Sequence, residues 1–294
     1  MRVYLGDLRY NYSGVLANDC MPLGVAYMKA VMDREDPSDE IDSRLFVYPE
    51  RLLDAIVRDA GLSPEDVVLE VGAGEGVLTE RLAEVASQVH VIELDRGLEP
   101  GLSGVIGRPN VNLVWADAVK YDLAGLDPAP TRMVANLPYA VATPVILRSA
   151  FELPSIESWS VMVQKEIGDR LRAGPGSKTY GAPSVLIQLT GEVRQVRKVS
   201  RTVFKPQPRV DSAIIRIDRT SPGPDEATRR LVRAGFAHRR KAMARSVDLA
   251  IPGSLRAVRD GLEAAGIDPG IRAEALSPAQ FAKLSGMIDL AADD

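Results

Sequence analysis

The feature that most limits the possible folds of this 294-residue chain is a glycine-rich turn between an apolar run and a helical pattern. The apolar run covers residues 66–71, the helical pattern covers residues 78–85, and Gly72, Gly74 and Gly76 lie between them. Glycine adopts positive φ angles and lets the backbone approach a ligand closely. A strand, a glycine turn and a helix in this order predict a unit of an α/β sheet that binds its ligand at the turn.

The rest of the first 220 residues repeats this alternation of apolar runs and helical patterns. We expect an amphipathic helix before the first run, and then further strands over residues 89–93, 111–114, 133–135, 159–164 and 213–217. Strands that alternate with helices at this spacing predict a parallel, doubly wound sheet. The expected fold class is therefore α/β, with ligands bound beyond the carboxyl ends of the strands.

A change in pattern follows Ser221-Pro222-Gly223-Pro224, which is the clearest linker in the chain. Only helical patterns follow it, near residues 225–249, 254–265 and 278–288. Ser277 and Gln280 predict a capping box at the start of the last helix. We therefore expect an N-terminal extension over residues 1–42, an α/β domain over 43–220 and a small all-α domain over 225–294.

Acidic residues near the strand ends indicate which ligand the glycine turn binds. Glu70 precedes the turn, where its charge would repel the pyrophosphate of a dinucleotide but suits a ligand with an amino group. The turn also has the pattern Gly-x-Gly-x-Gly instead of the Gly-x-Gly-x-x-Gly of dinucleotide enzymes. S-adenosylmethionine carries an ammonium and a sulfonium but no phosphate, so we expect it here, with a nicotinamide cofactor as the main alternative. Glu93 would accept hydrogen bonds from its ribose diol, and Asp117 from its adenine amino group.

The tetrapeptide Asn136-Leu137-Pro138-Tyr139, directly after the apolar run 133–135, indicates the second substrate. The exocyclic amine of a nucleobase is a weak nucleophile because its lone pair is delocalised into the ring. Hydrogen bonds from this amine to the Asn136 side chain and the Leu137 carbonyl would favour a more tetrahedral nitrogen. Tyr139 would stack on the base and Pro138 would fix the turn. The alternative is a strand-to-helix loop in which Asn and Pro are incidental.

These residues resemble those of a known family, the rRNA adenine N6,N6-dimethyltransferases, and most closely its small-subunit enzymes. The resemblance covers residues 43–290 and rests on the segments 69–79, 91–95, 136–139, 180–185, 204–213, 236–241 and 272–277. It implies a Rossmann-like class I methyltransferase sheet with a small all-α C-terminal domain. It also implies transfer of two methyl groups from S-adenosylmethionine to each of two adjacent adenosines near the 3′ end of small-subunit rRNA.

The resemblance also implies a set of site residues. The expected cofactor-binding residues are Phe46, Glu70, Gly72, Gly74, Gly76, Glu93, Leu94, Asp117, Ala118 and Asn136. Phe46 is what remains here of a family run, at residues 43–47, that helps to cover the methyl donor. The expected catalytic residues are Asn136, Leu137, Pro138 and Tyr139, with Phe204 as a second stacking surface for the target base.

Two basic clusters indicate that the target base belongs to RNA, although the net charge of the chain is −4. Residues 192–209 contain a single acidic residue, and residues 229–245 contain none. Such clusters neutralise phosphates and make affinity depend on salt; the alternative is a solvated protein face. The expected RNA-binding residues are Arg194, Arg197, Lys198, Arg201, Lys205, Arg239, Arg240 and Lys241.

The composition argues against several other classes of protein. One cysteine and two histidines leave no internal disulfide and too few ligands for a thiolate or histidine metal site. We expect a cytoplasmic monomer without metal or membrane contact, whose partner is structured RNA such as small-subunit rRNA or a pre-ribosomal particle. Two alternatives stay open. One is a methyltransferase of the same fold that acts on a small molecule or a different RNA, and the other is a non-catalytic RNA-binding assembly factor.

Overall fold

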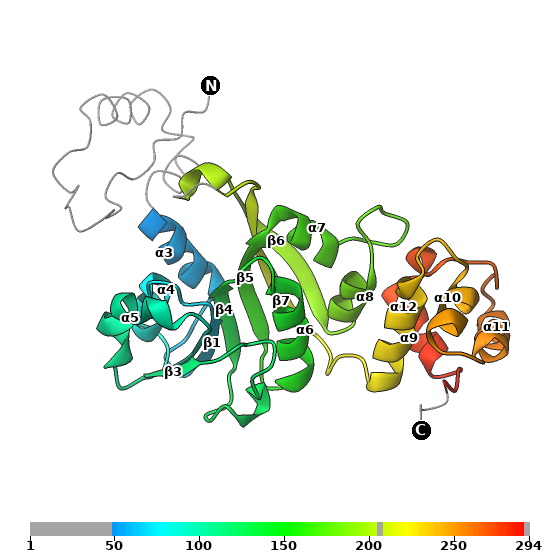
Figure 1. Cartoon of the computed structure of the whole chain (residues 1–294), viewed down its shortest axis with the longest axis horizontal. Helices are drawn as coiled ribbons and strands as arrows, with labels where there is room; N and C mark the ends of the chain where they lie inside the picture. Colours follow the sequence, from blue (N-terminus) through cyan, green and yellow to red (C-terminus); the bar gives the residue numbers. More distant parts are fainter. Residues whose placement is uncertain (1–48, 205–207, 291–294) are drawn as a thin grey trace.

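A computed structural model describes residues 49–204 and 208–290, which form a seven-stranded sheet followed by a group of helices (Figure 1). The strand order is β3-β2-β1-β4-β5-β7-β6. The first five strands in this order are parallel, and β7 and β6 are antiparallel to their neighbours. The strands are β1 (Val67–Val71), β2 (Gln88–Glu93), β3 (Val111–Trp115), β4 (Arg132–Asn136), β5 (Ser158–Gln164), β6 (Gly191–Val199) and β7 (Ser212–Arg219).

The predicted α/β class is confirmed, but the sheet is mixed instead of wholly parallel. β6 was not predicted as a strand. Its side chains alternate between exposed and partly buried positions, so this edge strand is polar on one side and its sequence was interpreted as a basic cluster. The segment 185–189, whose pattern fitted a strand or a helix, forms the end of the helix α8 (Ala182–Gln188) and its C-cap, Leu189.

Helices cover both faces of the sheet. On one face, α3 (Pro49–Ala60), α4 (Val77–Ala83) and α5 (Glu99–Ile106) enclose a core with Val68, Val134 and Met162. On the opposite face, α6 (Ala142–Glu152) packs on neighbours of those residues in the strands, such as Leu69, Ala135 and Val161. Burial on both faces explains why the central strands are almost continuously apolar in sequence.

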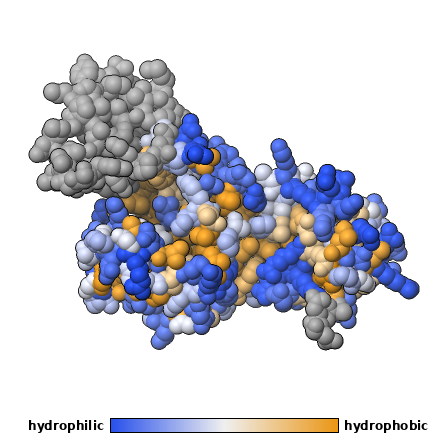
Figure 2. Space-filling model, in the orientation of Figure 1, coloured by the Kyte–Doolittle hydropathy of each residue, from blue (hydrophilic) through white to orange (hydrophobic). Residues whose placement is uncertain are grey.

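The C-terminal helices are α9 (Glu226–Ala237), α10 (Met243–Ala250), α11 (Leu255–Ala264) and α12 (Pro278–Ser285). The predicted capping box between Ser277 and Gln280 is present at the start of α12. The core of this group includes residues before the linker, because Tyr180 and Val185 are buried in it and the Tyr180 hydroxyl donates to the Leu276 carbonyl at 2.8 Å. α7 (Lys165–Leu171) and α8 therefore connect the end of β5 to these helices. Hydrophilic side chains predominate over this part of the surface (Figure 2).

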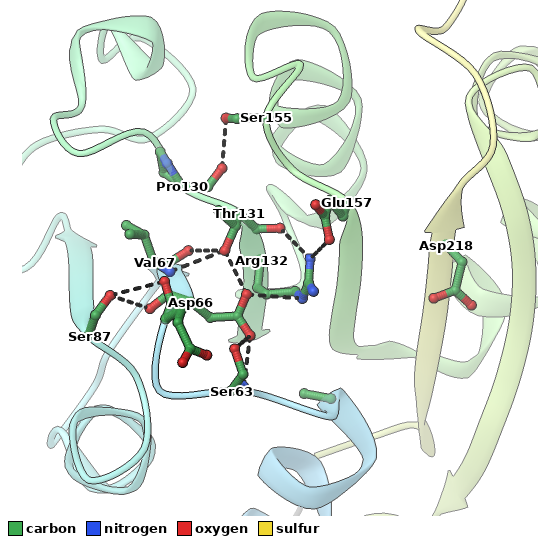
Figure 3. A network of polar contacts seen from close by, with 12 residues as sticks. Ser63, Asp66, Val67, Ser87, Pro130, Thr131, Arg132, Ser155, Glu157 and Asp218 are labelled. Carbon is green, nitrogen blue, oxygen red and sulfur yellow. Dashed lines mark hydrogen bonds and ion pairs between the residues drawn. The ribbon is translucent and has the colours of Figure 1, made fainter.

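A polar network lies at the amino edge of the sheet, where β1 and β4 begin (Figure 3). Asp66 accepts hydrogen bonds from the Ser63 amide and the Thr131 hydroxyl, both at 2.8 Å, and lies 3.4 Å from the Arg132 guanidinium. Burial raises the pKa of Asp66, but these hydrogen bonds and Arg132 outweigh it and hold the pKa below its usual value.

In the described part of the chain no helix is long and apolar enough to cross a membrane.

Candidate active site at the carboxyl edge of the sheet

The motifs singled out in the sequence meet at the carboxyl edge of the parallel strands. Val71 at the end of β1 pairs with Ile92 in β2, and Glu93 at the end of β2 pairs with Trp115 in β3. On the other side of β1, β4 ends at Asn136. The glycine turn, the two acidic strand ends and the Asn136 tetrapeptide therefore share one edge, as expected for a ligand site in such a sheet.

The turn after β1 requires glycine at three positions. The φ angles of Gly72, Gly74 and Gly76 are 79°, 59° and 80°, in the left-handed region that other residues rarely adopt. The Gly72 amide donates to the Ile92 carbonyl at 2.9 Å, and Gly76 is the N-cap of α4. A Cβ atom at Gly74 would have no neighbour within 4 Å among the described residues, which leave open space beside this glycine.

The carboxylate of Glu93 is fixed by three backbone amides. One oxygen accepts from the Leu94 and Asp95 amides at 2.8 and 2.9 Å, and the other accepts from the Gly74 amide at 3.2 Å. Glu93 thus connects the glycine turn to the end of β2. Leu94 follows it with 69% of its surface exposed, which leaves an apolar side chain beside the turn.

Glu70 lies under the glycine turn and is only 1% exposed. Burial raises its pKa to about 8; the neighbouring Thr79 hydroxyl opposes this rise and the charge of Glu93 adds to it. Its Oε2 atom is buried and has no hydrogen-bond partner within the described residues. A buried carboxyl group without a partner is costly, so this position favours a cationic or hydrogen-bond-donating group of a ligand.

Asp117 follows β3 and is half-buried. Its Oδ1 accepts from the Val119 amide at 2.9 Å, and its Oδ2 lies 3.6 Å from the Lys120 ammonium. The adjacent Ala118 is buried. The Asp117 side chain therefore stabilises its own turn while Oδ2 remains at the edge of the site.

The residues of the tetrapeptide 136–139 alternate between exposed and buried or half-buried positions. Asn136 and Pro138 are exposed, whereas Leu137 is buried and its amide donates to the Met162 carbonyl at 3.1 Å. Tyr139 is half-buried, and its hydroxyl lies 2.9 Å from the Ser212 hydroxyl. The buried leucine thus anchors a segment that presents an amide side chain at the carboxyl edge.

The predicted stacking residue Phe204 follows a short 3-10 turn, Arg201–Val203, after β6. It is half-buried and packs against the core on the α3 side of the sheet, so part of its ring is in contact with that core. Phe46 and Lys205, which were predicted to bind the cofactor and RNA, lie outside the described residues.

The structure pairs several of the predicted RNA-binding arginines with carboxylates. Arg197 forms a two-pronged contact with Asp59 on α3, and Arg194 pairs with Asp218 on β7. Arg239 pairs with Glu274 at 2.9 Å. Each of these three arginines therefore has a carboxylate partner in the fold, and their contact with phosphates stays a prediction. The basic side chains that are exposed and available to a partner are those of Lys198, Arg201, Arg240 and Lys241.

Two residues at the site were not assigned a role from sequence. Ser212, which begins β7, contacts Tyr139, and Asp211 precedes it. Both lie in the segment 204–213, which resembles the family but whose individual roles the pattern does not disclose. Asp211 lines a cleft of about 390 Å³, together with Lys165, Glu166, Asp169, Thr179, Arg201, Arg209 and Val210.

Comparisons with known proteins agree with this geometry. Residues 42–290 match a family described as ribosomal RNA adenine dimethylase. The chain is 44% identical over 229 residues to the ribosomal RNA small subunit methyltransferase A of Rubrobacter xylanophilus, with 76% of this chain and 86% of the relative covered. It is 38% identical over 280 residues to the protein of that name from Corynebacterium efficiens, with 90% and 96% covered.

Two solved structures resemble the fold. One is a dimethyladenosine transferase from Plasmodium falciparum, with a TM-score of 0.67 and 24% identity over 81% of this chain and 97% of that chain. The other is the 23S rRNA methyltransferase ErmE, with a TM-score of 0.57 and 29% identity over 81% and 97% of the two chains. Both likenesses extend beyond the sheet to most of the described chain.

Proposed function

The chain belongs to the ribosomal RNA adenine dimethylase family, and on that premise we propose that it transfers methyl groups from S-adenosylmethionine to adenine amino groups of small-subunit rRNA. The observation that carries this proposal is the contact between the two halves of the site. The glycine turn suited to the methyl donor packs directly on Pro138 of the tetrapeptide suited to the amine. Donor and acceptor segments therefore share one surface.

The residues around the turn fit the methyl donor. The open space at Gly74 admits a ligand, and the fixed Glu93 carboxylate lies where a ribose would be held. Leu94 offers an apolar surface to the adenine ring, with Asp117 at its amino group. The unpartnered Oε2 of Glu70 suits a nearby ammonium group. When bound, S-adenosylmethionine supplies an electrophilic methyl group on a sulfonium.

The residues of the tetrapeptide would hold and polarise the target amine. The exposed Asn136 side chain and the Leu137 carbonyl accept its hydrogens, which increases electron density on the nitrogen. Tyr139 stacks on the base and directs the amine towards the methyl group. Positioning of this kind accounts for a large part of the acceleration of a direct transfer.

The partner is proposed to be the small subunit or a precursor particle, contacted in the cytoplasm by a monomer through Lys198, Arg201, Arg240 and Lys241. All four side chains are exposed and none of them pairs with a carboxylate within the described residues, which supports this choice. Without such contacts a half-exposed ring and a single amide would not select one adenosine in a large RNA.

The test is transfer of labelled methyl groups from S-adenosylmethionine to four acceptors: unmethylated small-subunit particles, free small-subunit rRNA, large-subunit rRNA and small amines. We expect dimethyladenosine in small-subunit RNA. Asn136→Ala is the matched variant, and it should lose transfer by at least about 100-fold while donor binding by calorimetry changes little. Label in no RNA would overturn the proposal, and label only in large-subunit RNA would change the substrate.

A further inference from the structure

The acceptor side of the site depends on a residue pair that lies outside the tetrapeptide. Ser212 is 1% exposed and begins β7, where it pairs with Gln164 at the end of β5 and with Val199 at the end of β6. Three strand ends therefore converge on this one residue. Its backbone is held by the sheet, so its hydroxyl has a fixed position.

The Ser212 hydroxyl meets the Tyr139 hydroxyl at 2.9 Å. The backbone next to Tyr139 is anchored by Leu137 and Pro138, whereas this is the polar contact that reaches the far end of the ring. A tyrosine ring rotates about two side-chain torsions, and a hydrogen bond at its hydroxyl restricts rotation about both. Ser212 thus fixes the plane of the ring on which the target base would stack.

Asp211 does the same for the segment that carries Phe204. Its side chain accepts a hydrogen bond from the Arg201 amide at 2.9 Å, which closes the turn before Phe204. Its carbonyl accepts from the Lys165 amide at the start of α7, also at 2.9 Å. Two consecutive residues at the start of β7 are therefore hydrogen-bonded to the two segments that bear the aromatic side chains of the acceptor site.

We propose that Asp211 and Ser212 are positioning residues of the methyl transfer, with Ser212 orienting Tyr139 and Asp211 holding the turn that bears Phe204. The proposal rests on the proposed function. Within the described residues no hydrogen bond joins either residue to the donor turn, so we expect their effect to be on the base and not on the donor. A small error in the angle of a stacked base moves its amine out of line with the methyl group, and misplacement of about 1 Å costs about 100-fold in rate.

The test is a double-mutant cycle of Ser212→Ala and Tyr139→Phe, with single-turnover transfer to small-subunit RNA as the measurement. Each variant removes one hydroxyl of the pair. We expect each to lower the transfer rate about 10-fold, and the double variant to be no slower than either single variant. Non-additivity of this kind identifies a shared interaction. The affinity for S-adenosylmethionine should change by less than about twofold.

Controls separate positioning from a general effect on the fold. Ser160→Ala removes another buried hydroxyl of the same sheet, one without a hydrogen-bond partner in the described residues, and should leave the rate unchanged. Ser212→Thr keeps a hydroxyl and should recover most of the rate. For Asp211, the isosteric Asn keeps an acceptor for the Arg201 amide and should retain more activity than Asp211→Ala.

The outcomes are distinguishable. If the wild type transfers no methyl group, the proposed function is wrong and this inference falls with it. If the wild type is active and Ser212→Ala matches Ser160→Ala, or if the effects of Ser212→Ala and Tyr139→Phe multiply, the positioning role is wrong. Equal losses in rate and in donor affinity would also overturn it, because they would indicate damage to the whole site.

Discussion

Gly72 and Pro138 are in such close contact that a single added methyl group would not fit between them. A Cβ atom at Gly72 would lie 2.9 Å from both Cγ and Cδ of Pro138, and the φ angle of Gly72 is 79°. The first residue of the donor turn therefore packs on the acceptor tetrapeptide without an intervening side chain. This contact sets the distance between the two substrates of the proposed reaction.

Gly72→Ala should consequently impair stability and transfer together. Left-handed backbone at a non-glycine residue and the overlap with Pro138 together cost about 2–4 kcal/mol. The tetrapeptide has to shift, and we expect transfer to fall by at least about 100-fold in the molecules that fold. Denaturant unfolding and single-turnover transfer measure the two effects.

Gly104→Ala is the matched control for this prediction. Gly104 lies in α5, and a Cβ atom there would have no neighbour within 4 Å. Alanine is the better helix former, so stability should be equal or slightly higher and transfer unchanged. Comparable damage from both substitutions would show that the Gly72–Pro138 contact has no special role.

The contact between Gly72 and Pro138 also shows what sequence patterns convey and what they leave out. Each motif has a local signature, because a left-handed turn needs glycine and a strand buried on both faces needs apolar residues. The order of the strands then brings the motifs to one edge. Packing between distant segments has no such signature, so neither this contact nor the Tyr139–Ser212 hydrogen bond could be predicted.

Charge patterns were the least informative part of the sequence. Arg197 belongs to a basic cluster, yet it is bonded to Asp59, a residue far from it in the chain. Because β6 is an edge strand, its basic residues resemble those of a solvated or RNA-binding face. Whether a basic residue is available to a phosphate depends on which carboxylates the fold brings near it, and local sequence does not contain that information.

The buried carboxyl group of Glu70 should make stability depend on pH. Its pKa is raised to about 8 in the folded protein, chiefly by burial, from an ordinary value of 4.5. Between these values the folded state holds a proton that the unfolded state lacks. The contribution of Glu70 is therefore fully present below pH 4.5 and is lost as the pH rises through about 8, by up to about 1.4 kcal/mol per pH unit.

Glu70→Gln removes this titration, so the variant should gain stability relative to the wild type as the pH rises from 5 to 8. Denaturant unfolding of both proteins across this range is the measurement. Glu84→Gln, the same substitution at an exposed position just after α4, is the matched control. A constant difference between Glu70→Gln and the wild type would mean that Glu70 does not titrate in this window.

Asp66 should have the opposite pH dependence, because its pKa is held below the ordinary value of 3.8. Its contribution is present above that value and is lost as the pH falls through the lower folded pKa. Asp66→Asn replaces an acceptor of the Ser63 and Thr131 bonds and leaves Arg132 with less compensation. We expect a loss of about 2 kcal/mol at pH 7 that shrinks on acidification.

Because this network lies at the amino edge of the sheet, Asp66→Asn should leave the transfer rate per folded molecule unchanged (Figure 3). Unfolding at pH 7 and at a pH below 3.8, together with transfer under conditions in which the variant is folded, checks both statements. A lower rate in fully folded protein would contradict the purely structural role of this edge.

The exposed pair Arg240 and Lys241 should contribute to RNA affinity in a way that depends on salt. These residues lie in the turn between α9 and α10, and both side chains are exposed. If each contacts a phosphate, substitution of both by Glu should weaken RNA binding and reduce the slope of log affinity against log salt by about 2.

Arg197→Ala is the comparison, because it removes a basic residue that already pairs with Asp59. That variant should lower stability and leave the salt slope as in the wild type. Binding of small-subunit RNA measured from low to high salt distinguishes the two, and an unchanged slope for the Arg240 and Lys241 variant would assign this turn to a solvated surface.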